Sequence, residues 1–590
     1  MTITRSIIIT ALLNFTLALN GQNLNYIPNW SNAGNYSKIN SSKTVHINDF
    51  ESNNNGSTSN NSAFTNALKT LGNQGGIIKF GRGTYLFTSG ISIPNNVHIK
   101  GEGANTNLAF ELSTEQDAIS FTGSIELRKY KLAKSAFRSN NTIQLKSTDN
   151  LKINDLIKIS APNSNLTTTT WAKESIAQIT KIKSINGNKI TIEDELRINF
   201  LMADDALVQK IIPLKNAGLS CIQIITKDST ANNGSNIKML YTENCYVKNV
   251  ISEYCNYAHI ELDNNYRTQV SGSFLRFAHN YNKGIKGNGI LIRNSSSNCL
   301  IENNCFSFLV HSLSIESGAN GNVVSYNYSE RTYWEKPNEP SNASADLLLN
   351  GNYPFANLFE GNIFQNISIS NKNGTNGPNT FFCTWADLFG FSMHKNSADS
   401  LNIIKTRVTN NLPQFGKFNL SGNGHFEYKT LIVNKKRFDS LPVIDTVSFY
   451  INDSAFFTFL KNDYRNLAEK RYEENTYINC GNATDISSEL DPDTVQIKYS
   501  ETAINNIEEP NISIYPIPTK DFLYIKINQS CSFNGLIIDA NGKPVEQFKM
   551  PEGMPKNNYK IATGHLNNGF YSLVIFADNY IITKRFVISH

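Results

Sequence analysis

The chain has 590 residues, of which 40% are hydrophobic and 17% charged, and its formal net charge is +5. This hydrophobic content excludes a disordered chain, and a small positive charge carried by scattered Lys and Arg argues against a nucleic-acid partner. Length alone suggests about four domains, unless the fold grows by repetition. The eight cysteines include no Cys-x-x-Cys pair, so no zinc site or disulfide framework is predicted.

Residues 1–21 have the pattern of an export signal. Arg5 precedes an apolar run from Ile7 to Leu19, and Asn20 and Gly21 follow it. The run is too short to span a bilayer, so we expect a cleaved signal peptide and an exported protein.

Residues 22–123 are predicted to form an N-terminal cap and the first coils of a repeated β fold. The strand patterns GGIIKFGRGTYLF and ISIPNNVHIKGEG follow an amphipathic helix with apolar positions at Ala63, Phe64, Ala67, Leu68 and Leu71. A solenoid needs such a cap, because its open end would expose apolar side chains and an unpaired strand edge.

Residues 124–215 show a different alternation. The segment KSINGNKITI places an Asn-Gly turn between two alternating runs, which is a strong hairpin signal. We expect a small antiparallel β subdomain inserted between early coils.

A short apolar strand that ends in a small or amide residue recurs within residues 216–448. The outward residues of six such strands are 23, 31, 23, 35 and 22 residues apart: Lys248, Ser271, Glu302, Ser325, Glu360 and Phe382. Intervals near 23 fit one coil of a parallel β-helix, and the longer ones fit a coil plus an inserted loop. The predicted fold is all-β, a right-handed single-stranded parallel β-helix, with Asn303 as an inward residue of an amide ladder.

Each coil also contains an earlier strand, and alternation places its polar residues outside the bore. One outward column reads Asp263, Arg293, Glu316, Asn350 and Ser370. A second column reads His259, Gly289, Ser312, Asp346 and Asn366, with His311 one residue before its strand. Neighbouring rungs lie roughly 4.8 Å apart, so these columns predict a polar sheet face that could bind a sugar chain.

Two chemistries fit these residues. Elimination next to a uronate carboxylate needs a cation, for which Arg293, Lys286 and Arg331 are candidates, and a base, for which His311 is the candidate. Hydrolysis of a neutral glycan needs a pair of carboxylates, for which Glu316, Asp346 and Glu360 are available. The predicted catalytic residues are His311, Arg293, Glu316 and Asp346. The predicted substrate-binding residues are Lys286, Arg331, Tyr333, Trp334, Asn350, His259 and Asp263.

The polar columns also have structural explanations. An Asp-Arg-Glu series can simply avoid like charges on a solvated face, and Tyr333 and Trp334 can anchor a loop as well as stack on a sugar. No metal motif is present, although Asp263, Glu316 and Asp346 offer the oxygen ligands that Ca²⁺ prefers.

The sequence pattern changes in the C-terminal part. Residues 449–506 contain a predicted helix, SAFFTFLKNDYRNLAEKRYEEN, and an acidic linker, ELDPDT. Residues 507–590 then read as short strands, among them ISIYPIPTKDFLYIKI, GLIIDANGKPVEQF and LNNGFYSLVIF. This segment resembles the C-terminal sorting domain of the type IX secretion system of Bacteroidota, although Pro516-Ile517-Pro518 stands in place of the usual Pro-Asn-Pro. The resemblance implies a seven-stranded β-sandwich that is recognised by that secretion machinery.

The N-terminal coils and the segment from His311 to Phe382 resemble the pectate-lyase-like β-helix superfamily. The segment departs from one secreted bacterial group of that superfamily at two positions. Val310-His311 stands where the group has Arg-His, and Asn350-Gly351 stands where it has His-Gly, so the resemblance does not assign the group's usual catalytic residues to these two positions.

These features predict a secreted or cell-surface protein that acts on a polysaccharide and is a monomer. A polysaccharide lyase that cleaves an acidic, uronate-containing glycan by β-elimination is the first hypothesis. A glycoside hydrolase with paired carboxylates is the second, and a non-catalytic glycan-binding or adhesive protein is the third.

Overall fold

The computed structural model describes residues 25–34, 43–229, 234–281, 286–333, 345–409, 417–428, 430–433, 512–516, 518–527, 533–539, 544–550, 559–577 and 580–590. The predicted signal peptide, the predicted helix and linker within 449–506, and Trp334 lie outside these residues.

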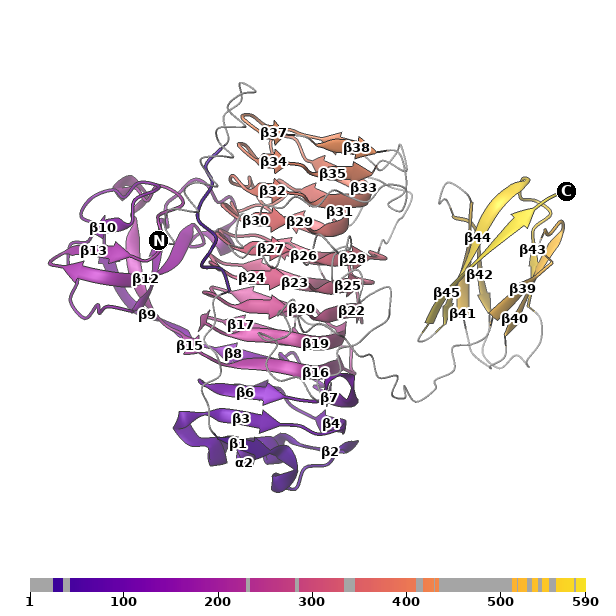
Figure 1. Ribbon diagram of the computed structural model, residues 1–590, viewed down its shortest axis with the longest axis horizontal. Helices are drawn as coiled ribbons and strands as arrows, with labels where there is room; N and C mark the ends of the chain where they lie inside the picture. Colours follow the sequence, from indigo (N-terminus) through magenta and orange to yellow (C-terminus); the bar gives the residue numbers. More distant parts are fainter. Residues whose placement is uncertain are drawn as a thin grey trace, which may run out of the picture. The chain divides into compact units, whose positions relative to one another are not determined.

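The main body is a parallel β-helix in which each coil adds one strand to each of three sheets (Figure 1). The first sheet contains β21 (Gln269–Ser271), β24 (Leu300–Glu302), β27 (Val323–Ser325), β30 (Leu358–Glu360), β32 (Thr380–Phe382), β34 (Asn402–Ile404) and β37 (Phe426–Tyr428). The second contains β22 (Phe274–Ala278), β25 (Cys305–Ser307), β28 (Tyr328–Glu330), β35 (Arg407–Thr409), β38 (Leu431–Val433) and the first halves of β31 (Ile363–Ile369) and β33 (Trp385–Met393). The third contains β17 (Ile237–Leu240), β20 (Ala258–Asp263), β23 (Asn288–Arg293), β26 (His311–Ile315), β29 (Leu347–Leu349), β36 (Lys417–Asn419) and the second halves of β31 and β33.

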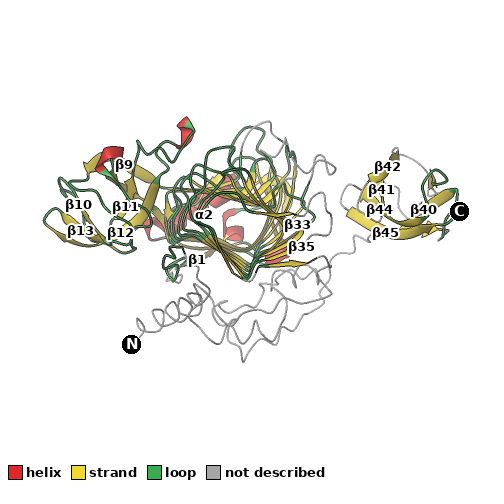
Figure 2. Ribbon diagram, turned by 90° about the horizontal axis from the view of Figure 1, so that it is seen from above, coloured by secondary structure: helices red, strands yellow, loops and turns green. Residues whose placement is uncertain are grey.

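The predicted register of the first sheet is confirmed. Lys248, on β19 (Tyr246–Cys255), pairs with Ser271, and the series continues rung by rung through Glu302, Ser325, Glu360 and Phe382. Seen from above, the coils superimpose closely (Figure 2).

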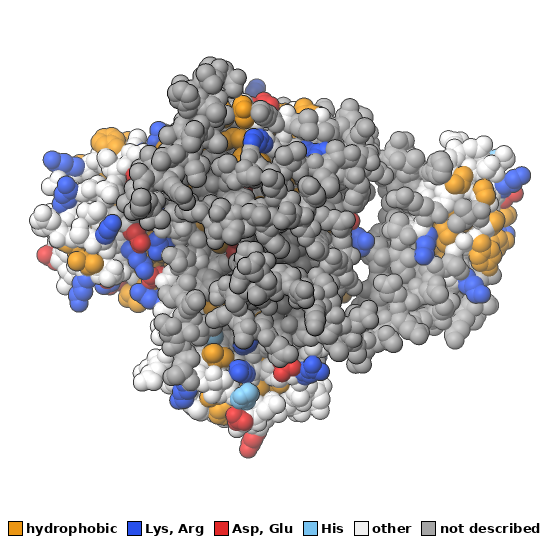
Figure 3. All heavy atoms as spheres, in the orientation of Figure 1, with side chains coloured by type: hydrophobic (Ala, Val, Ile, Leu, Met, Phe, Trp, Pro, Cys, Tyr) orange, Lys and Arg blue, Asp and Glu red, His pale blue; other side chains and the backbone are white. Residues whose placement is uncertain are grey.

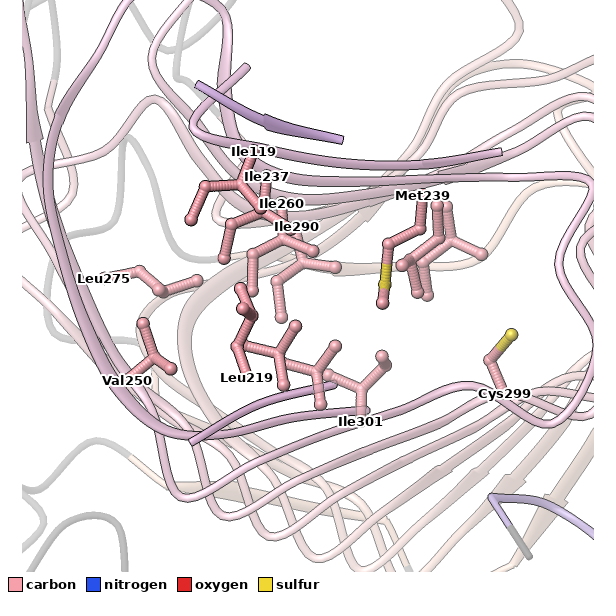
Figure 4. Close-up of a cluster of buried hydrophobic side chains, with 14 of the residues drawn as sticks. Ile119, Leu219, Ile237, Met239, Val250, Ile260, Leu275, Ile290, Cys299 and Ile301 are labelled. Atoms are coloured by element: carbon pink, nitrogen blue, oxygen red, sulfur yellow. The ribbon is translucent and has the colours of Figure 1, made fainter. Parts of the chain in front are cut away.

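Apolar side chains fill the bore. The inward residues of the third sheet, such as Ile237, Ile260 and Ile290, are fully buried and stack on their counterparts in neighbouring coils (Figure 4). Each contributes about 1.5–3 kcal/mol by burial, so every added coil extends one continuous core.

Buried amides line the turn between the first and second sheets. Asn304 donates to Asn327 Oδ1 at 3.0 Å, and Asn327 donates to Asn362 Oδ1 at 2.9 Å. The prediction that Asn303 is the inward residue is wrong by one position. Asn303 instead has φ 54° and takes the left-handed corner of the turn, and a shift of one residue reverses the side on which a side chain lies.

The N-terminal cap and first coils close one end of the bore. Helix α2 (Asn61–Leu71) buries Ala63, Phe64, Ala67 and Leu71 against these coils. The strands are β1 (Thr44–His46), β2 (Asn55–Ser59), β3 (Gly76–Lys79), β4 (Gly83–Phe87), β5 (Ile91–Ser92), β6 (Val97–Lys100), β7 (Thr106–Phe110), β8 (Ile119–Thr122) and β16 (Gly218–Thr226).

Residues 25–34 cross the outer side of the first sheet. Trp30 is buried among Leu300, Val323, Leu358 and Phe382, and its Nε1 donates to the carbonyl of Ala356 at 2.8 Å. This segment therefore covers apolar side chains of the first sheet that would otherwise face solvent.

A six-stranded antiparallel sheet, with strand order β10-β13-β12-β11-β14-β9, interrupts the early coils. Its strands are β9 (Ser124–Lys131), β10 (Thr142–Gln144), β11 (Leu156–Ser160), β12 (Ala177–Asn186), β13 (Lys189–Ile192) and β14 (Leu207–Ile212), and it has its own apolar core. Buried polar contacts join this inserted subdomain to turns of the β-helix, including a 2.8 Å hydrogen bond from Lys158 Nζ to Asn264 Oδ1.

The C-terminal unit is a sandwich of two antiparallel sheets. One contains β39 (Ile512–Tyr515), β40 (Phe522–Ile527) and β43 (Tyr559–Ala562), and the other β41 (Phe533–Asp539), β42 (Pro544–Met550), β44 (Gly569–Ala577) and β45 (Tyr580–Ile588). Side chains from both sheets, such as Leu523 and Leu573, share its core. Within the described parts of the whole chain, no helix has the length and apolar character needed to cross a bilayer.

Candidate functional site

The outer face of the third sheet carries two rows of polar side chains. In one row Lys238 pairs with Glu261, and in the other Asp263 pairs with Arg293. Glu316 and Asn350 directly follow the next two strands, β26 and β29, whose register continues that of β23. The structure therefore brings together four predicted site residues, Asp263, Arg293, Glu316 and Asn350.

Arg293 lies at the centre of this group and bridges two carboxylates from different coils. Its guanidinium nitrogens are 3.4 Å from Glu316 Oε1 and 3.6 Å from Glu261 Oε1. Arg293 also donates to the hydroxyl of Tyr257 at 3.4 Å. Side-chain exposure is 4% for Glu261, 8% for Glu316 and 20% for Arg293, so the ion pairs are only slightly screened by water. Glu261 and Tyr257 were not among the predicted site residues.

Burial changes the protonation of these groups. Desolvation raises the pKa of both Glu261 and Glu316 above the ordinary glutamate value, even though Arg293 opposes the shift in each case. The pKa of Tyr257 is raised to about 12, mainly by burial, so its hydroxyl stays protonated at neutral pH. Two carboxyl groups that hold protons more readily than usual thus flank one permanent cation.

The two glutamates differ in their other neighbours. Lys238 Nζ lies 3.5 Å from Glu261 Oε2, so Glu261 has two cationic partners. Glu316 has one, and it accepts a 2.8 Å hydrogen bond from the side-chain amide of Asn350. Asp263 accepts hydrogen bonds from the amides of Asn264 and Asn294 at 2.7 and 2.9 Å. The glutamates are therefore not equivalent, and Glu261 is better stabilised as a carboxylate.

A tryptophan from the inserted subdomain lies over this group. Trp171, in the short helix η4 (Thr170–Ala172), has its ring centroid 5.3 Å from the Arg293 guanidinium carbon. Sequence patterns could not identify this residue, because more than a hundred positions separate it from Arg293 and only the docking of the inserted subdomain brings it here.

His259 and Asp346, predicted to line the face, are buried instead. His259 packs between Ser252 Oγ (2.8 Å from Nδ1) and the carbonyl of Phe277 (2.9 Å from Nε2). Both carboxylate oxygens of Asp346 accept hydrogen bonds, from Ser329 Oγ and from the backbone N–H of Gln365, each at 2.8 Å. These residues lie where the second sheet bends into the third, and the neighbouring strand covers the outward side. The positions of His259 and Asp346 do not suit contact with a polysaccharide.

His311 is separated from Arg293 along the sheet. It pairs with Asn288, five residues before Arg293, which corresponds to about 16 Å of strand. Its Nδ1 donates to the carbonyl of Ala345 at 2.5 Å. The predicted base and the predicted cation therefore do not converge on one sugar ring.

The remaining predicted residues lie near the loops at this bend. Lys286 is buried, whereas Arg331 is exposed with its guanidinium 5.6 Å from the centroid of the Phe308 ring. The Tyr333 ring stacks on Tyr281, with centroids 3.8 Å apart. Tyr333 thus anchors one loop to the other, which was one of its two predicted roles.

A calcium site built from Asp263, Glu316 and Asp346 does not fit the geometry. Asp346 lies at the buried bend, away from the other two, and among the described residues no three His, Cys, Asp or Glu side chains are grouped as metal ligands. Glu360, the other acid considered, lies on the first sheet and accepts a hydrogen bond from Tyr326 at 3.0 Å.

Comparison with protein families identifies two parts of the chain. Residues 44–286 match the family described as rhamnogalacturonase A/epimerase, pectate lyase-like, and residues 513–589 match the secretion system C-terminal sorting domain. No curated protein matches the chain. The chain thus combines a pectate-lyase-like β-helix domain with a sorting domain that directs it through the type IX secretion system to the cell surface or the medium.

Solved structures share the fold at low identity. An exopolygalacturonase from Thermotoga maritima is 12% identical with a TM-score of 0.36, and the alignment covers 70% of this chain and 89% of that one. The tailspike gp49 of Pseudomonas phage LKA1 is 11% identical with a TM-score of 0.39, covering 66% and 77%. PfbA, a surface adhesin of Streptococcus pneumoniae, is 11% identical with a TM-score of 0.34, covering 66% and 91%.

Proposed function

We propose that this protein is a secreted or surface-attached glycoside hydrolase that cleaves a polysaccharide on the outer face of the third sheet. The observation that carries the proposal is the pair Glu261 and Glu316, two nearly buried carboxyl groups with raised pKa values on either side of Arg293. The match to a family whose description includes rhamnogalacturonase supports glycan cleavage.

The different surroundings of the two glutamates suggest different roles. Hydrolysis needs one carboxylic acid to protonate the leaving oxygen and one carboxylate to activate water or attack the sugar. Glu316, with one cationic neighbour, is the better general acid. Glu261, held between Lys238 and Arg293, is the better base or nucleophile. Arg293, which contacts both, stabilises the carboxylate that forms when Glu316 gives up its proton.

Elimination, the first hypothesis from the sequence, finds less support. A lyase needs its base close to the cation that neutralises the uronate carboxylate, and the strand from Asn288 to Arg293 separates His311 from Arg293. The charge of Arg293 is also already balanced by two carboxylates.

A panel of neutral and uronate-containing polysaccharides, incubated with the exported protein, tests the proposal. Hydrolysis predicts new reducing ends without the ultraviolet absorbance of an unsaturated sugar. Because Glu316 must be protonated to act and its pKa lies above the ordinary 4.5, we expect the alkaline limb of the pH-rate profile above pH 4.5. Absorbance that rises with the reducing ends would identify a lyase, and no products on any polysaccharide would leave glycan binding as the function.

A further inference from the structure

We propose that the inserted subdomain is a wall of the substrate-binding site, with Trp171 as the surface on which a sugar ring of an acidic polysaccharide stacks. This inference rests on the proposed function, because it takes the third sheet as the glycan-binding face. It adds a binding residue and a substrate class to that site.

The loop that carries Trp171 is held at both ends by the β-helix. On one side, the backbone N–H of Thr168 donates to Asn352 Oδ1 at 3.2 Å, and Asn352 Nδ2 donates to Thr169 Oγ1 at 2.8 Å. On the other side, Ser295 Oγ donates to the carbonyl of Ser175 at 2.7 Å. Asn352 and Ser295 belong to turns that directly follow third-sheet strands, so the loop arches over the end of the candidate site.

These anchors hold an aromatic side chain that is partly exposed. Trp171 is 49% exposed although it lies against Arg293, so about half of this residue remains open to solvent. The Arg293 guanidinium already makes a cation–π contact with the Trp171 ring. Exposed aromatic faces of this kind stack on the apolar C–H face of a sugar ring, and tryptophan offers the largest such area at little conformational cost.

Charge indicates which glycans the wall would accept. Residues 124–215 contain 15 Lys and Arg and 9 Asp and Glu, a formal net charge of +6, whereas the whole chain carries +5. The excess of positive over negative charge thus lies in the inserted subdomain, and many Lys and Arg side chains lie over its visible surface (Figure 3). Lys173, two residues after Trp171, is exposed. A positive wall attracts an anionic polymer along its length and favours it over a neutral one.

The test measures binding by affinity electrophoresis in gels that contain polygalacturonate, alginate, hyaluronan or neutral dextran. We expect the full chain to be retarded by at least one acidic polymer and not by dextran. Trp171→Ala should raise the dissociation constant about tenfold or more, and Trp171→Phe should retain most of the affinity. Phe137→Ala is the matched control, because Phe137 is an aromatic residue of the same subdomain with 52% exposure, and this variant should bind like the wild type.

Binding and cleavage separate the two proposals. Three results would contradict the proposed binding role of Trp171 and the inserted subdomain. These are equal retardation of Trp171→Ala and wild type, retardation by dextran alone, and no retardation by any polymer. If binding depends on Trp171 but no cleavage product forms, hydrolysis is contradicted and the binding role of Trp171 is supported. If the polysaccharide is cleaved but binding does not depend on Trp171, hydrolysis is supported and the binding role of Trp171 is contradicted.

Discussion

Polar residues on the third sheet have two different environments. Some lie on the outer face of the sheet, and others lie at the bend between the second and third sheets. Glu261, Arg293 and Glu316 lie on the outer face, where Arg293 contacts both carboxylates and the Trp171 ring lies over its guanidinium. His259 and Asp346 point away from the bore like the others, but at the bend the adjacent strand buries them. Burial of the same residue types therefore produces a candidate site in one place and structural hydrogen bonds in the other.

His259 makes the stability of the β-helix depend on pH. Burial lowers its pKa to about 3, against 6.5 for an ordinary histidine, so the unfolded chain takes up the proton first as the pH falls. This contribution to stability is complete above pH 6.5 and is lost as the pH falls towards 3. His259→Gln keeps a donor for the Phe277 carbonyl but cannot titrate. We expect it to flatten the dependence of unfolding free energy on pH between 6 and 4 by up to about 1.4 kcal/mol per pH unit.

Thermal unfolding at several pH values measures this effect. His98, whose burial lowers its pKa to about 4, remains in the variant, so some dependence on pH persists. Parallel curves for the wild type and His259→Gln would show that His259 is protonated in the folded protein.

At the scale of elements, the amide ladder connects one coil to the next. Asn327, in a buried turn, donates to the Ile301 carbonyl of the preceding coil at 2.9 Å and to Asn362 of the following coil, and its oxygen accepts from Asn304. Asn327→Ala leaves several of these groups without partners. We expect a loss of about 2–4 kcal/mol in stability, seen as a lower midpoint of thermal or denaturant unfolding.

Asn303→Gly is the control for this ladder. Asn303 belongs to the corresponding turn of the preceding coil, next to Asn304 of the ladder, but it has φ 54°, a conformation that glycine adopts readily, so we expect a change within about 1 kcal/mol. If Asn303→Gly destabilised the protein as strongly as Asn327→Ala, the ladder would not be the source of the effect.

At the scale of the whole molecule, the sequence predicts the repeated coils well. It predicts poorly the contacts between segments that are distant in sequence. The register from Lys248 to Phe382 follows from spacing, because parallel coils repeat the same pattern of alternation. The sorting domain follows from its strand patterns. Glu261 lies on the same strand as Asp263, two residues earlier. It is the next outward position along that strand and could have been found from the alternation. Trp171 could not, since its position depends on hydrogen bonds between the inserted subdomain and turns that are distant in sequence.

The release of reducing ends by Glu316→Gln tests the central claim most directly. The substitution keeps the shape of the side chain and a hydrogen bond with Asn350 but removes the proton that the general acid must give. On a polysaccharide that the wild type cleaves, we expect a loss of about 100-fold or more in rate. Glu302→Gln, which changes an acid on the first sheet, should cleave like the wild type. Glu316→Gln that cleaves at the wild-type rate would contradict hydrolysis by the third-sheet carboxylates.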